Sequence, residues 1–174
     1  MKEDTDEQSS NNINLGSAKL KKFFINHLNR IYSAKLHLVE RLPLLHKEAH
    51  FLDLQNAIAE TVENVEKQIT RMELIYALLD ENVAPANVLG LTGLIDDAFE
   101  AIQQQKGEAE LRDLSIVFYL QNIESVEMAS FQILRMAAVK IKNNQVSKLL
   151  KENYEEAKAD RTLFLLISTK YITN

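Results

Sequence analysis

The sequence contains no cysteine, only two prolines and only four glycines among its 174 residues. The absence of cysteine excludes disulfide bonds, cysteine-ligated zinc, iron–sulfur clusters and cysteine nucleophiles. Because proline and glycine mark turns, their scarcity indicates few and long secondary-structure elements. Long helices fit this pattern, whereas a fold made of many short strands does not.

Features of membrane, secreted and nucleic-acid-binding proteins are also missing. No apolar run approaches the ~20 residues that a membrane helix needs, and the N-terminus lacks the basic and apolar regions of a signal peptide. The net charge is −5, and no basic stripe is interleaved with aromatic residues. We therefore expect a soluble, cytoplasmic protein that binds neither membranes nor nucleic acid.

Apolar residues recur at steps of three and four along four long stretches, which predicts amphipathic helices. We place these helices at residues 18–46, 53–80, 108–141 and 145–171, with a shorter amphipathic helix at 88–105. Residues 1–17 are polar and acidic, so we expect a disordered N-terminal tail. Residues 18–174 then form one domain, for which the chain is long enough.

Individual residues predict where these helices begin, end or bend. Ser17 and Asp53 are candidate N-caps of the first two helices. Gly107 supplies left-handed geometry after the short helix, and Asn143 with Asn144 makes the last turn. Pro43 lies inside the first helical pattern, which predicts a kink or a local break there.

The lengths of the connections predict the topology. Short turns join the first two long helices and the last two, so each pair is antiparallel. About 27 residues join the two pairs, enough to cross the bundle while carrying the short helix. The expected fold class is therefore all-α: a ferritin-like four-helix bundle with a long crossover that carries a short extra helix.

Each long helix carries polar residues near its middle, on or beside its core-facing seam. Antiparallel packing brings these residues to one level, where buried carboxylates need a cation or protons. Bundles of this topology place di-iron or di-manganese sites there, built from four glutamates and two histidines. The expected central polar layer comprises Lys35, Asn64, Gln68, Gln121 and Asp160, and the candidate metal ligands are Glu124, Glu127 and Glu156.

Several short motifs together resemble one known family. They are Tyr32-Ser33-Ala34, Gln68-Ile69-Thr70-Arg71, Gly93-Leu94-Ile95, Arg112-Asp113, Gln121, Glu124, Glu127-Met128-Ala129, Leu149-Leu150-Lys151-Glu152 and Glu155-Glu156. From Phe23 to Phe164 the chain resembles the YciE/YciF family of ferritin-like proteins. The resemblance implies a bundle that usually binds two metal ions, is often dimeric and is linked to bacterial stress responses, without an established enzymatic activity. We therefore expect a homodimer.

The departures from that family affect half of its metal ligands. Lys35 stands where the family has glutamate after Tyr-Ser-Ala, and Asn64 replaces another glutamate. Ser125 and Thr61 replace two histidines. Only the carboxylates of the third and fourth long helices remain, and one ligand position is now positively charged.

Three interpretations of Lys35 and the remaining carboxylates stay open. Its ammonium could replace the metal by pairing with Glu124, Glu127 or Glu156. It could instead extend to solvent, leaving its aliphatic stem as packing. A mononuclear site could also survive on the three glutamates.

The favoured function is a metal-free ferritin-like protein, structural or stress-related, with a vestigial di-metal site, no catalytic residues and no cofactor. The alternative is an iron- or manganese-binding protein with a reduced carboxylate site and redox or metal-handling activity. Whether the chain is an enzyme stays open, with the missing ligands favouring a non-enzyme. Storage of iron in a shell is a third class, for which the sequence offers little support.

Overall fold

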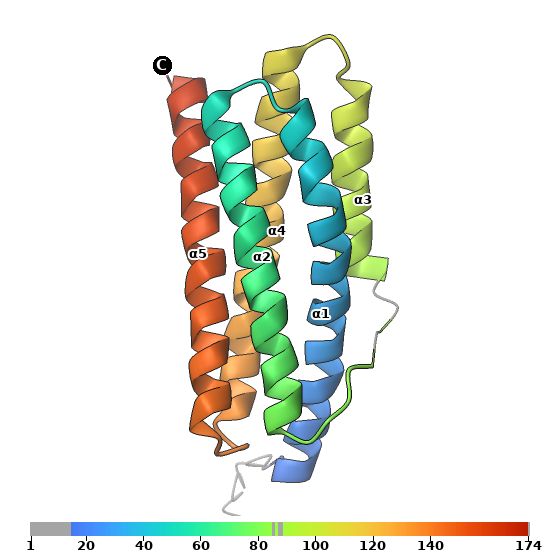
Figure 1. Cartoon of the computed structure of the whole chain (residues 1–174), viewed down its shortest axis with the longest axis vertical. Helices are drawn as coiled ribbons and strands as arrows, with labels where there is room; N and C mark the ends of the chain where they lie inside the picture. Colours follow the sequence, from blue (N-terminus) through green and yellow to red (C-terminus); the bar gives the residue numbers. More distant parts are fainter. Residues whose placement is uncertain (1–14, 85, 87–88, 174) are drawn as a thin grey trace, which may run out of the picture.

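The computed structural model describes residues 15–84, 86 and 89–173, and this part of the chain contains five helices and no strand. The helices are α1 (Ser17–Glu48), α2 (Leu52–Leu78), α3 (Leu89–Gln104), α4 (Ala109–Ala138) and α5 (Asn144–Thr173). Four of them form a bundle, and the shorter α3 lies outside it against α1 and α4 (Figure 1). The predicted all-α architecture, including the short helix in the crossover, is confirmed.

Successive helices alternate in direction along the length of the bundle (Figure 1). The contacts between α4 and α5, α1 and α2, α2 and α5, and α1 and α4 close the bundle on four sides. Because α3 runs back along the bundle, α4 starts at the end where the turn between α1 and α2 lies. All four neighbouring pairs in the bundle are therefore antiparallel.

The buried apolar residues divide into two clusters, one toward each end of the bundle. The cluster near the α1–α2 turn includes Leu38, Leu42, Ile58, Leu120 and Phe164. The cluster at the opposite end includes Phe24, Leu28, Met72, Phe131 and Leu150. On every bundle helix, the buried polar residues of the predicted central layer lie between these two sets in sequence. The polar layer is thus enclosed by apolar packing above and below.

The predicted N-caps of the first two helices are both wrong. Ser17 is the first residue of α1, because the extended conformation of an N-cap falls on Gly16 instead. Helix α2 begins at Leu52 with Phe51 as its N-cap, so Asp53 lies in the first turn. There Asp53 forms an ion pair with Lys170 of α5.

A buried carboxylate from α4 holds the start of α2. Asp113 is fully buried, and its two oxygens accept the backbone N–H of His50 at 3.0 and 2.8 Å. The backbone N–H of Phe51 donates to Asp113 Oδ2 at 2.5 Å. A carboxylate at this position satisfies amide donors and complements the positive end of the α2 dipole. Asp113 therefore connects the α1–α2 turn to α4.

Other helix boundaries follow the sequence more closely. Gly107 has the predicted left-handed conformation (φ 100°), and Asn143 Oδ1 caps α5 by accepting the N–H groups of Gln145 and Val146. The left-handed residue of that last turn is Lys142 (φ 57°), not an asparagine.

Helix α1 continues through Pro43 to Glu48, so the expectation of a local break is wrong. Leu42 and Leu45, on either side of the proline, are buried in the same apolar cluster and hold the helix in place. The predicted start of the crossover helix at Val88 and most of the predicted tail lie outside the described residues.

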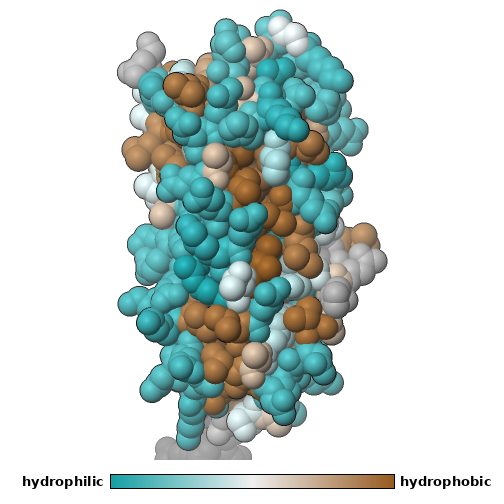
Figure 2. Space-filling view, in the orientation of Figure 1, coloured by the Kyte–Doolittle hydropathy of each residue, from teal (hydrophilic) through white to brown (hydrophobic). Residues whose placement is uncertain are grey.

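The face of the bundle seen in Figure 2 is mostly hydrophilic. Figure 2 shows hydrophobic side chains gathered along the middle of one face, flanked by hydrophilic side chains. Within the described ranges, no helix combines the length and the hydropathy that a membrane span requires.

The Asp113 cap predicts the effect of its removal. Asp113→Ala should lower the free energy of unfolding by about 2–3 kcal/mol, because hydrogen bonds to a charged group are lost and the amide donors of the turn lose their acceptor. Urea unfolding measures this change, with Asp97→Ala on the exposed face of α3 as control. Equal small losses for both variants would show that the cap does not stabilise the turn.

Candidate functional site

Lys35 of α1 points into the centre of the bundle. Its side chain is fully buried, and its Nζ lies 2.5 Å from Oε2 of Glu127 on α4. The ammonium also lies 5.5 Å from the centre of the Phe131 ring, within the range of a cation–π contact. The structure therefore excludes the interpretation in which Lys35 extends to solvent, and it shows a buried ion pair between α1 and α4.

Glu124 lies one helical turn before Glu127 and is also buried, with 1% of its surface exposed. Burial raises its pKa well above the usual range, and the negative charge of Glu127 raises it further, while Lys35 partly offsets both effects. Neither Glu124 oxygen has a donor among the described residues. The balance of these effects favours the protonated, neutral form of Glu124.

A neutral Glu124 would help the core to accommodate the buried ion pair of Lys35 and Glu127. One ammonium (Lys35), one carboxylate (Glu127) and one neutral acid (Glu124) carry no net charge together. An unpaired ion in the same place would cost several kcal/mol, on the order of the stability of the whole domain. The ion pair, together with the neutral form of Glu124 that its raised pKa favours, therefore allows these residues to pack between two apolar clusters.

The layer continues on α2 and α5 through an amide–carboxylate pair. Asn64 Nδ2 donates to Oδ1 of the buried Asp160 at 2.9 Å. Burial raises the pKa of Asp160 to about 6, although the Asn64 hydrogen bond and the charge of Lys35 act in the opposite direction. Thr61 and Gln68 of α2 are fully buried at a similar depth. Asn64 and Asp160 thus lie within the electrostatic reach of Lys35, Glu124 and Glu127.

Buried polar atoms without a hydrogen-bond partner concentrate in this layer. Among the described residues they are Thr61 Oγ1, both polar atoms of the Gln68 side chain, both oxygens of Glu124, Asp160 Oδ2 and, outside the layer, Arg112 Nε. Buried polar groups are ordinarily paired, so such a concentration is unusual. A proton on Glu124 can satisfy part of this demand, and the remainder marks the layer as the least satisfied polar part of the core.

Glu156, the third predicted metal ligand, has a different partner. Arg71 of α2 donates to both Glu156 oxygens, from Nη1 at 2.6 Å and from Nη2 at 2.8 Å. The same guanidinium reaches Glu152 at 3.1 Å and the buried Asn153 at 3.3 Å. This network joins α2 to α5 beside the layer and leaves Glu156 paired with arginine, not lysine.

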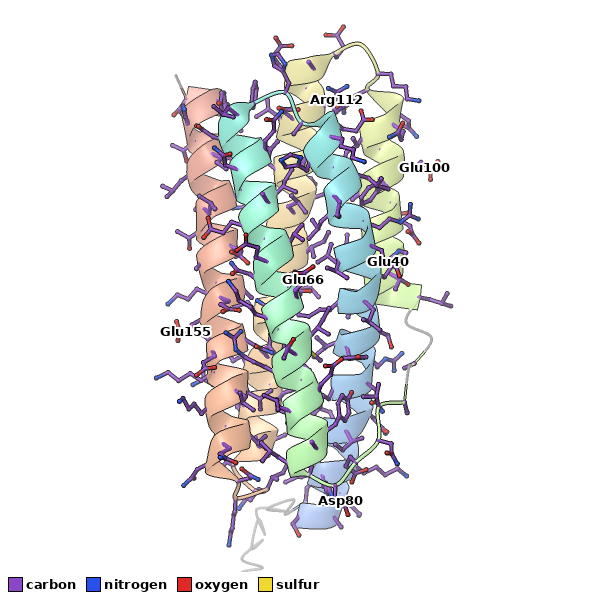
Figure 3. The ribbon with its side chains drawn as sticks, viewed as in Figure 1. Glu40, Glu66, Asp80, Glu100, Arg112 and Glu155 are labelled. Carbon is purple, nitrogen blue, oxygen red and sulfur yellow. The ribbon has the colours of Figure 1, made fainter. Side chains whose placement is uncertain are left out.

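Two other residues from the sequence analysis lie at the margin. Gln121 is partly exposed, and its side chain makes no hydrogen bond to the layer within the described part of the chain. Glu155 is exposed, and Figure 3 shows its label on the outer side of α5, away from the other helices. Neither residue contributes to the charge balance around Lys35.

The roles of Arg71, Asn153 and Asp113 were not foreseen in the sequence analysis. Arg71 and Asp113 entered it only as parts of the family motifs. Arg71 and Glu156 are 85 residues apart in sequence, and Asp113 is 63 residues from His50. In the sequence, each of these charged residues is marked only by its place beside an apolar seam, and that place does not identify its partner.

The residues in the layer do not fit a two-metal centre. Such a centre needs several ionised carboxylates together with imidazoles. Here the raised pKa of Glu124 favours its neutral form, Glu127 is paired with an ammonium 2.5 Å away, and Ser125 accepts a hydrogen bond from Arg161 Nε at 2.8 Å. Over the described ranges, no group of three or more His, Asp or Glu residues is arranged to hold a metal ion.

Comparisons with known proteins agree with this architecture. Residues 19–171 match a family described as a domain of unknown function, DUF892. Protein YciF of Escherichia coli strain K12 is 29% identical over 137 residues, which cover 78% of this chain and 82% of YciF.

Two solved structures are similar over most of the chain. The E. coli stress protein YciF is 25% identical with a TM-score of 0.84, covering 89% of this chain and 98% of the other. YcfI from Rhodopseudomonas palustris is 24% identical with a TM-score of 0.79, covering 89% of this chain and 96% of the other. The fold is therefore YciF-like and ferritin-like, as predicted.

The different states of the two glutamates predict different effects of the same substitution. Glu127→Gln should lower the free energy of unfolding at pH 7 by about 3–5 kcal/mol, because it leaves the buried ammonium unpaired. Glu124→Gln should change it by less than about 1 kcal/mol, because a neutral amide replaces a neutral acid of similar shape. Urea unfolding of both variants measures the contrast. Equal losses would contradict the assignment of the proton to Glu124.

Asp160 predicts a pH dependence of stability. Its folded-state pKa of about 6 exceeds the ordinary 3.8, so the folded state binds the proton more tightly than the unfolded state. The resulting cost is fully present above pH 6 and disappears as the pH falls toward 3.8. Asp160→Asn removes this titration, so its stability relative to the native protein should rise by about 2–3 kcal/mol between pH 4 and pH 8.

Unfolding by urea at a series of pH values measures this difference. Asp97→Asn, an exposed aspartate of α3, serves as the matched control and should show no such trend. A difference between Asp160→Asn and the native protein that stays constant over this range would refute the raised pKa.

Proposed function

Since the chain belongs to the DUF892 family and is similar to YciF, we propose that it is a metal-free, non-enzymatic ferritin-like protein with a structural, stress-related role. In this proposal the Lys35 ammonium takes the place that metal ions hold in ferritin-like bundles with carboxylate sites. The layer then holds the four helices together instead of performing redox chemistry.

The single observation that supports this proposal is the buried pair of Lys35 and Glu127, with 2.5 Å between its charged atoms. A divalent cation beside this ammonium would be repelled, and it would compete for the carboxylate that neutralises the lysine. Lysine also supplies only donors, so it cannot act as a ligand while it is protonated. The position of Lys35 therefore supports a role in stabilising the folded bundle and not a role in binding metal.

The stress-related part of the proposal comes from the comparison with YciF, which is described as an E. coli stress protein. The likeness covers 89% of this chain, so it concerns the whole bundle and not one segment. The sequence also predicts a homodimer, and this remains part of the proposal. Sedimentation velocity measures the oligomeric state.

A second candidate function is metal binding at a reduced carboxylate site. The observation that favours it is the set of unpartnered oxygens on Glu124 and Asp160, two buried carboxyl groups near the same lysine. Iron or manganese prefers such oxygen ligands. Metal binding of this kind would require Glu124 to lose its proton and Lys35 to move away from Glu127.

Metal analysis distinguishes the two functions. Protein purified without chelator and then incubated anaerobically with Fe²⁺ or Mn²⁺ should retain almost no metal after desalting. The double variant Lys35→Glu/Asn64→Glu restores two carboxylates at positions where the family has glutamate, and it should gain metal binding. Mass spectrometric metal analysis measures the bound ions per chain.

A matched control introduces the same charges on the surface. Lys67→Glu/Asn56→Glu changes two exposed residues of α2 and should bind no more metal than the native protein. Stoichiometric iron or manganese in the native protein would overturn the proposal and favour the second function. A double variant that folds but binds no metal would show that Lys35 does not stand at a former metal-ligand position.

A further inference from the structure

A cavity of about 570 Å³ lies between α1, α4 and the first turns of α3. Some of the residues between positions 23 and 31 of α1, 90 and 94 of α3 and 126 and 134 of α4 line it. Its size falls within the range of about 300–1,000 Å³ in which small-molecule sites are found. It does not include the residues of the central polar layer that surround Lys35.

The walls are mainly hydrophobic, with large apolar side chains from all three helices, such as Ile31, Leu94 and Val126. Ser130 is the one hydroxyl in the lining, and it already donates to the backbone carbonyl of Val126 at 2.8 Å. The body of a ligand in this cavity must therefore be apolar. An aliphatic chain matches these walls better than a sugar or a nucleotide does, since those would leave polar groups unpaired.

The charge at the cavity is positive. Arg30 is exposed and has no carboxylate partner among the described residues, and the described lining contains no acidic side chain. His27, the other ionisable residue of the lining, packs with its ring 4.4 Å from the Phe23 ring at the rim. A guanidinium with free donors binds a carboxylate through two parallel hydrogen bonds. The chemistry of the cavity thus combines apolar walls with one anion-binding group.

The length of the cavity disfavours a docked helix. The nine-residue stretch of α1 beside it spans ~13 Å, whereas an average helix of 11–12 residues is ~17 Å long. Side chains from three helices line this partly open space, so it also differs from the flat faces on which helices pack. A small amphiphile fits these dimensions better than a protein segment does.

We propose that this cavity is a binding site for an aliphatic carboxylate, with its chain between α1, α3 and α4 and its carboxylate on Arg30. The proposal is independent of the state of Lys35. It adds a ligand-binding activity to a bundle whose central layer does not fit a two-metal centre.

Isothermal titration calorimetry with three probes of equal chain length tests the chemistry of this site. Decanoate should bind with one molecule per chain, decan-1-ol should bind about tenfold more weakly, and decyltrimethylammonium should not bind. The tenfold difference reflects the loss of a hydrogen-bonded charge pair. Arg30→Gln should weaken decanoate binding about tenfold and leave decan-1-ol unchanged. Lys22→Gln, an exposed cation of α1 outside the lining, is the control and should change neither.

Two glycines of α3 supply a matched pair that tests the location. A side chain at Gly90, which lines the cavity, or at Gly93, which does not, would meet no atom within 4 Å of its Cβ. Gly90→Phe should fill the space and abolish binding of both decanoate and decan-1-ol, whereas Gly93→Phe should bind both normally. Thermal unfolding shows whether each variant folds. If Gly90→Phe does not fold, Ile133→Glu introduces a carboxylate at a half-exposed lining position and should exclude decanoate.

Three results would overturn the proposal. The first is no saturable binding of decanoate to the native protein below its micelle concentration. The second is binding that persists unchanged in folded Gly90→Phe or Ile133→Glu. The third is a dimer, seen by sedimentation velocity, that Gly90→Phe dissociates while decanoate has no effect on it. That last result would assign the cavity to contact with a second copy of the chain.

Discussion

A buried ammonium is stable only beside a compensating charge, and Lys35 of α1 has that charge in Glu127 of α4. The remaining features of the layer follow from this pair. Burial and the negative charge of Glu127 both raise the pKa of Glu124, which favours its neutral form beside this ion pair. Apolar clusters on both sides of the layer exclude water and strengthen the attraction between the paired groups.

The layer also determines how the helices are connected. The pair of Lys35 and Glu127 joins α1 to α4, whereas Asn64 with Asp160 and Arg71 with Glu156 join α2 to α5. Polar contacts of this kind depend on direction, so they set the relative position of helices that apolar packing alone would leave less defined. This specificity gives a physical reason for retaining charged residues where a metal centre does not fit.

Much of the fold could be predicted from the sequence, because periodicity and connection lengths report on helices and their order. The central layer was predictable for the same reason: Lys35, Asn64 and Glu124 each lie near the middle of a helix. The partners were not predictable, since Glu127 and Glu156 are equally plausible acceptors for a lysine on another helix. The N-cap predictions were wrong where a residue distant in sequence caps the helix in place of a neighbouring one, as Asp113 does for α2.

The protonation states of Glu124 and Glu127 are the most direct expression of this charge balance. Carbon-13 NMR of the side-chain carboxyl groups in metal-free protein reports each state separately across a pH titration. The account predicts that at pH 7 Glu124 gives the chemical shift of a neutral acid while Glu127 gives that of a carboxylate. Ionised carboxylates at both Glu124 and Glu127 at pH 7 would contradict it, because Lys35 is the only cation paired with either of them among the described residues.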